Sequence, residues 1–139
     1  LGTAGNWIAY AGDWETGVAM TRRAVEIAQV NSERWWYWAA GKHTWLKGEY
    51  EAALDAFMLG YEENYWHNEL HLAYTLPLLG RHREAEEAAE RLEELWPGFT
   101  RADARRTHRR WCFDEDFIGR MDAALARAGV PDQPDISLK

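Results

Sequence analysis

The sequence has few of the features of secreted, membrane or nucleic-acid-binding proteins. Among its 139 residues is a single cysteine, Cys112, so no disulfide can form within the chain, which agrees with a reducing compartment. No apolar run approaches the roughly 20 residues that cross a bilayer. A net charge of −7 argues against a surface for nucleic acid. We therefore expect a cytoplasmic protein with neither nucleic acid nor membrane as a partner.

The length is sufficient for one domain with a hydrophobic core and short for two. The first residue is Leu1 rather than methionine, and the sequence begins within a stretch that we expect to be helical. We therefore expect the chain to be a piece of a longer protein.

Three segments of the sequence resemble one another. Gly12–Met20, Gly48–Phe57 and Gly80–Ala89 each show glycine, a charged residue, an aromatic residue or histidine, and a small residue five positions after the glycine. A further small residue lies seven positions before each glycine: Gly5, Gly41 and Ala73. The glycines are 36 and 32 residues apart, close to the period of about 34 of a known helical repeat.

With this period the chain resembles three tetratricopeptide repeats over about residues 1 to 98. The resemblance implies an all-α fold, a right-handed superhelical solenoid of three helical hairpins. It departs from the family at Pro77, which interrupts a helix, and at Tyr65, which replaces a frequent proline. We expect repeats at 1–31 (cut short at its start), 32–65 and 66–98, two C-terminal capping helices in 99–131, and a tail at 132–139.

Glycine and polar residues mark the expected helix ends. Each repeat glycine ends a helix, and the polar residue after it begins the next one. Ser32, Thr100 and Asp114 are expected helix caps. The helices of the repeats are expected near 2–11, 14–30, 33–47, 49–64, 66–79 and 82–95. The seam that they bury is predicted to contain Ile8, Ala24, Ile27, Ala40, Ala53, Phe57, Leu72, Leu76, Ala85 and Leu95.

A narrower resemblance concerns the C-terminal quarter of the chain. A set of residues here is similar to the ends of bacterial multidomain proteins that often carry a class III adenylate cyclase domain or a winged-helix regulator ahead of tetratricopeptide repeats. The set consists of residues 97–100 (PGFT), Ala102, Arg105, the pair Phe113-Asp114 and residues 125–131 (LARAGVP). The pair Trp111-Cys112 departs from that pattern. The resemblance implies that this chain is the non-catalytic tail of a larger bacterial protein.

Aromatic residues give the strongest functional signal, since the chain has nine tryptophans. Trp35, Trp38, Lys42 and Trp45 form a stripe at i, i+3, i+7 and i+10 of one helix, rotated away from the seam that packs against the partner helix. In the tetratricopeptide family the first helices of successive repeats line a concave groove, so the resemblance assigns this stripe to a groove. The predicted groove residues are Asn6, Tyr10, Trp35, Trp38, Lys42, Trp45, His67, Leu70 and Tyr74.

This pattern predicts a protein-interaction module, with a scaffold or regulatory role, that binds a partner peptide or helix, because interface hot spots favour tryptophan and tyrosine. Three alternatives stay open: a homodimer contact through the same surface, packing of these rings in the core, and a small-molecule sensor. The carboxylate clamp of chaperone-binding family members is not reproduced, since only Asn6 fits it.

No residue pattern predicts an enzyme or a cofactor. His67 and His71 lie one helical turn apart, but no third metal ligand is evident nearby in sequence. Cys112 and His108 lack an oxyanion site and an orienting group. Arg101, Arg105 and Arg109 form a cationic stripe, for which we expect local pairing or plain solvation. The expected partners are the glutamates of the preceding helix: Glu86, Glu87, Glu90, Glu93 and Glu94.

Overall fold

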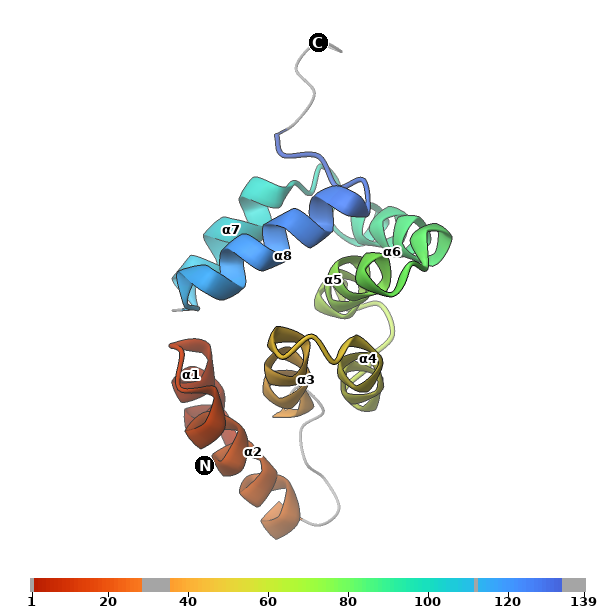
Figure 1. Ribbon diagram of the computed structural model, residues 1–139. Helices are drawn as coiled ribbons and strands as arrows, with labels where there is room; N and C mark the ends of the chain where they lie inside the picture. Colours follow the sequence, from red (N-terminus) through yellow and green to blue (C-terminus); the bar gives the residue numbers. More distant parts are fainter. Residues whose placement is uncertain (1, 29–35, 112, 134–139) are drawn as a thin grey trace. The chain divides into compact units, whose positions relative to one another are not determined.

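The computed structural model describes residues 2–28, 36–111 and 113–133. Within these ranges the chain forms eight α-helices and one 3-10 helix, and it has no β-strand (Figure 1). The predicted all-α class is confirmed. In order, the elements are α1 (Gly2–Tyr10), α2 (Trp14–Ala28), α3 (Trp36–Leu46), α4 (Tyr50–Leu59), α5 (Trp66–Thr75), η1 (Leu76–Leu79), α6 (His82–Leu95), α7 (Arg101–Arg110) and α8 (Glu115–Arg127).

The repeat glycines end helices as predicted. Gly12, Gly48 and Gly80 have φ angles of 115°, 82° and 73°, a backbone conformation that residues with a Cβ rarely adopt. After the first of them, Asp13 caps α2, because its Oδ1 accepts a hydrogen bond of 3.2 Å from the Thr16 amide. The threefold sequence pattern therefore corresponds to a threefold structural one: helix, glycine turn, helix.

Two other predicted helix signals also have structural counterparts. Thr100 and Asp103 form a reciprocal cap at the start of α7: the Asp103 amide donates to Thr100 Oγ1 over 3.2 Å, and the Thr100 amide donates to Asp103 Oδ2 over 2.9 Å. Pro77 has no amide hydrogen for a helical bond, and the chain there changes from α5 to the 3-10 helix η1. Ser32, the predicted cap of the third helix, lies outside the described residues.

The chain divides into two compact units, which we describe separately. The first contains Leu1–Glu63 and Trp111–Asp114, and the second contains Asn64–Arg110 and Glu115–Lys139. In the first unit α1 packs against α2, α3 packs against α4, and α3 also contacts α1 and α2. The close packing of α1 against α2 requires glycine at position 17, since a Cβ there would lie 2.3 Å from the backbone nitrogen of Ala9.

In the second unit α5 packs against α6, and α8 contacts α5, α7 and η1. The buried side chains of this unit include Leu70, Tyr74, Leu92, Phe117, Ile118, Met121 and Leu125. Across the described ranges, every helix is too short or too polar to traverse a lipid bilayer.

The predicted seam is right at some positions and wrong at two. Ala24, Ala53, Phe57, Leu76 and Ala85 are buried. Two aliphatic members are instead exposed, Ile27 by 62% and Leu95 by 37%. Each lies in the last turn of its helix. For Ile27, α2 has 15 residues and is longer than its partner α1, which has 9. Helical periodicity fixes the face on which a residue lies but not how far the neighbouring helix extends.

Candidate functional site

The ammonium of Lys42 lies among three aromatic rings in the first unit. Its Nζ is 5.1 Å from the ring centroid of Tyr10, 5.4 Å from that of Trp38 and 5.5 Å from that of Phe113. These distances are within the roughly 6 Å range of cation–π attraction. The rings come from α1, from α3 and from the segment Trp111–Asp114. We call these four residues the Lys42 cluster.

Lys42 is completely buried, with 0% of its surface exposed. Burial removes water from the ammonium and therefore lowers the pKa of Lys42 well below its ordinary value of 10.5. Aromatic faces attract a cation but stabilise it less than water does. The free energy of the charged ammonium therefore rises relative to that of the neutral amine. Burial therefore favours the neutral amine of Lys42 over its ammonium form.

Phe113 and Asp114 contact the first hairpin through ring stacking and one hydrogen bond on α1 and a second hydrogen bond on α2. The Phe113 ring stacks on Tyr10 with centroids 4.0 Å apart and planes 18° from parallel. The Asp114 amide donates to the Tyr10 carbonyl over 2.8 Å, and Asp114 Oδ2 accepts from Trp14 Nε1 over 3.1 Å. One aromatic residue and the acidic residue that follows it thus make all of these contacts.

The other predicted groove residues of the first unit are buried as well. The Trp38 indole donates to the carbonyl of Gly60 over 3.3 Å, so it is directed toward the residue that follows its partner helix α4. Trp45 is 1% exposed and lies edge-on to Tyr50, with ring centroids 6.1 Å apart. Asn6 is 3% exposed. Trp35 lies outside the described residues.

The predicted groove residues of the second unit lie under α7 and α8. His67, Leu70 and Tyr74 are all buried on α5. The His67 ring is 5.8 Å from that of His108 on α7, and the Tyr74 ring meets Phe117 on α8 edge-on at 6.1 Å. His108 of α7 and Phe117 of α8 therefore lie against this face of α5.

The structure brings the two histidines considered as metal ligands close to a third. The rings of His67 and His71 are 4.6 Å apart, and His108 lies beside His67. His108 Nδ1 donates to the carbonyl of Ala104 over 2.7 Å. Within the described part of the chain, no three or more histidine, cysteine, aspartate or glutamate side chains are arranged to hold a metal ion. Cys112, which was considered with His108, lies outside the described residues.

The cationic stripe on α7 is paired, but with partners other than those expected. Arg101 and Arg105 both form ion pairs with Asp122 on α8. Arg105 also reaches Asp132 at 2.7 Å, and Arg109 pairs with Glu115 at 3.0 Å. The expectation that glutamates of α6 neutralise this stripe is wrong at these three arginines, because α8 and the residues after it supply the carboxylates.

All described members of the predicted groove set are at most 7% exposed. They therefore line no open hollow, and residues of the same chain cover them within each unit. Their role in binding a partner stays a prediction, and a partner reaches them only where the covering residues move. The sequence analysis missed Phe113 and Asp114 as covering residues. In the sequence they are only an aromatic residue followed by an acidic one, and such a pair does not indicate which helix it packs against.

Replacing Lys42 with methionine is expected to change the pH dependence of stability. Because the folded-state pKa of Lys42 is lowered, the unfolded chain binds the proton more tightly. Between the lowered pKa and 10.5, the free energy of unfolding of the wild type should therefore rise with pH, by up to about 1.4 kcal/mol per pH unit. Lys42→Met should lose this rise.

Urea unfolding followed by circular dichroism between about pH 7 and pH 10 measures this effect. Lys47→Met is the matched control, since Lys47 is an exposed lysine in the turn that follows α3. Its profile should follow the wild type. Parallel profiles for wild type and Lys42→Met would show that the Lys42 ammonium is not desolvated.

Comparison with protein-family models, curated proteins and solved structures gave no match.

Proposed function

We propose that this chain is a protein-interaction module of tetratricopeptide type that binds a short segment containing an aromatic residue followed by an acidic residue. The binding face would be formed by Tyr10 of α1, Trp14 at the start of α2, and Trp38 and Lys42 of α3. The observation that carries the proposal is the chain's own segment Trp111–Asp114, which occupies this face through Phe113 and Asp114.

The architecture of the first unit supports the assignment to tetratricopeptide-type repeats. Its two hairpins each turn at a glycine with positive φ, Gly12 and Gly48, and α3 packs on both helices of the preceding hairpin. Stacking of this kind lets successive hairpins bury one continuous core. In the tetratricopeptide family the first helix of each hairpin lines the binding face, which corresponds here to α1 and α3.

The chemistry of the face matches the proposed ligand at three points. A flat ring fits against Tyr10 and within cation–π distance of Lys42. The Tyr10 carbonyl accepts the main-chain hydrogen bond that the next residue offers. The indole N–H of Trp14 then donates to a carboxylate at that residue, and hydrogen bonds to charged groups are stronger than neutral ones.

The internal segment makes the proposed site self-occupied. A ligand tethered to its own site competes at an effective concentration of about a millimolar. The apparent affinity for an external segment of the same chemistry is therefore reduced by the fraction of chains whose site is already occupied. Within a larger bacterial protein such a module would serve as a regulatory or scaffolding tail that responds to a competing partner.

Phe113→Ala is expected to open the face to an external ligand. A peptide with the sequence of residues 109–118, with serine in place of Cys112, should bind this variant at least about tenfold more tightly than it binds the wild type. Fluorescence anisotropy with a labelled peptide measures both affinities. The same peptide with alanine and asparagine at the positions of Phe113 and Asp114 should not bind.

Phe117→Ala is the matched control variant, because it truncates another buried phenylalanine, in the second unit. It should lower stability without strengthening peptide binding. Equal affinity of the peptide for wild type and Phe113→Ala, or equal affinity of the variant for both peptides, would contradict the proposal.

A further inference from the structure

A cleft of about 730 Å³ lies in the second unit. It is bounded by α6, by the connection from α6 to α7, and by the residues that follow α8. Its apolar lining residues include Ala89, Leu92, Phe99, Val130 and Pro131. A concave surface of this size with apolar walls can receive one or two side chains of a ligand.

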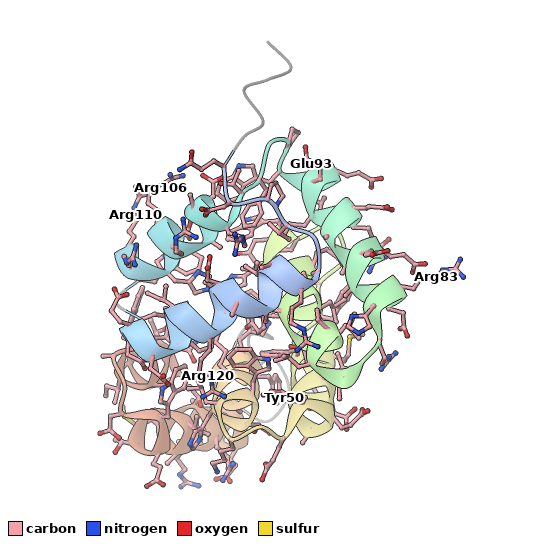
Figure 2. All side chains as sticks on the ribbon, turned by 45° about the horizontal axis from the view of Figure 1, so that its top comes forward. Tyr50, Arg83, Glu93, Arg106, Arg110 and Arg120 are labelled. Atoms are coloured by element: carbon pink, nitrogen blue, oxygen red, sulfur yellow. The ribbon has the colours of Figure 1, made fainter. Side chains whose placement is uncertain are left out.

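Three carboxylates line the α6 side of this cleft. Glu86, Glu90 and Glu93 are exposed and lie at i, i+4 and i+7, which places them on one face of α6 over a length of about 10 Å. Figure 2 shows Glu93 near the end of α6 that leads into α7. None of the residues that line the cleft is a lysine, arginine or histidine.

Nearby cations do not neutralise these carboxylates. On α6 and just before it, Arg83 pairs with Glu87 at 3.3 Å and Arg81 pairs with Glu84 at 2.6 Å. On α7, Arg101, Arg105 and Arg109 pair with carboxylates of α8 and beyond, and Arg106 pairs with Asp103 of α7 itself. Over the ranges that the structure covers, no ion pair joins Glu86, Glu90 or Glu93 to a basic side chain.

One of the three carboxylates is also fixed in position. Glu93 Oε1 accepts a hydrogen bond of 2.9 Å from the amide of Gly98, another residue of the cleft lining. This bond holds the carboxylate at the cleft, and a preorganised carboxylate loses less conformational entropy when it binds a cation.

From these observations we propose that the cleft binds a basic amphipathic segment of a protein partner. Apolar side chains of the segment enter between Ala89 and Val130, while arginine or lysine side chains one helical turn apart pair with the carboxylates of α6. Charge complementarity selects this occupant, because an apolar segment without cations leaves three carboxylates uncompensated and an acidic one is repelled. The cleft shares no lining residue with the face around Lys42.

A labelled amphipathic peptide of leucine and arginine in helical register tests the proposal on the full chain by fluorescence anisotropy. The double variant Glu86→Gln/Glu90→Gln should weaken its binding about tenfold. The matched double variant Glu87→Gln/Glu94→Gln removes the same charge from α6 at residues outside the cleft lining, and it should change affinity by less than about threefold. A peptide with glutamate in place of arginine should not bind.

Ala89→Lys provides a second test, since it places a cation on the wall of the cleft while Glu86 and Glu90 stay intact. It should abolish binding, and circular dichroism checks that its helical content equals that of the wild type. Three outcomes overturn the proposal: no binding by the wild type up to about 1 mM peptide, equal weakening by the two double variants, or undiminished binding to a folded Ala89→Lys chain.

Discussion

Replacing Trp45 with alanine is expected to lower the free energy of unfolding of the first unit by about 3 to 5 kcal/mol. The indole is 1% exposed and is one of the largest fully buried side chains of the described residues. Its truncation removes a large apolar area from the core and leaves a cavity that the surrounding helices fill only in part. Chemical denaturation followed by circular dichroism measures the loss without depending on tryptophan fluorescence.

Trp7→Ala is the matched control for this experiment. Trp7 is 46% exposed on α1, so the same substitution should change the free energy of unfolding by less than about 1 kcal/mol. Similar costs for the two variants would mean that Trp45 is not part of the core. The expectation of an open aromatic groove would then regain support, since groove residues can be truncated at little cost in stability.

Gly17→Ala is expected to destabilise the first hairpin by about 3 kcal/mol, at the upper end of the usual cost of overpacking. The added Cβ would lie 2.3 Å from the nitrogen of Ala9 and 2.4 Å from the carbonyl oxygen of Gly5. Both contacts are with backbone atoms, which cannot rotate away as a side chain does. Relief therefore requires α1 and α2 to move apart, which weakens their remaining contacts.

Gly119→Ala gives a control of the same chemical change with the opposite expected sign. A Cβ on Gly119 meets no atom within 4 Å, and the residue lies inside α8. Alanine has the higher helix propensity, so this variant should gain about 0.5 to 1 kcal/mol. Thermal unfolding of the two variants beside the wild type measures both effects. A stabilised Gly17→Ala chain would show that α1 and α2 do not approach so closely.

Helix positions could be predicted from the sequence because their signals are local. Gly12, Gly48 and Gly80 end helices through their own backbone conformation, and Thr100 caps α7 through a residue three positions away. Such signals depend on neighbours in the chain and hold whatever the tertiary arrangement. Pro77 was likewise recognised as an interruption, although its 3-10 conformation was not predicted.

The environment of the candidate site could not be predicted in the same way. Periodicity placed Trp38, Lys42 and Trp45 on one stripe of α3, but burial of that stripe is decided by residues distant in sequence. Phe113, which lies against Lys42, is among them. Ion pairing shows the same limit: Asp122, and not a glutamate of α6, pairs with Arg101 and Arg105, because tertiary packing and not sequence proximity selects the carboxylate.

The assignment of Trp111–Asp114 to the first unit limits how the polypeptide can be divided. The backbone passes between the units at three peptide bonds, after Glu63, after Arg110 and after Asp114. A shortened polypeptide that ends at Glu63 would therefore lack Phe113 and leave the Tyr10 ring without its stacking neighbour. The amine of Lys42 would then be exposed to water. A polypeptide shortened between two hairpins would therefore present a different surface from that of the intact chain.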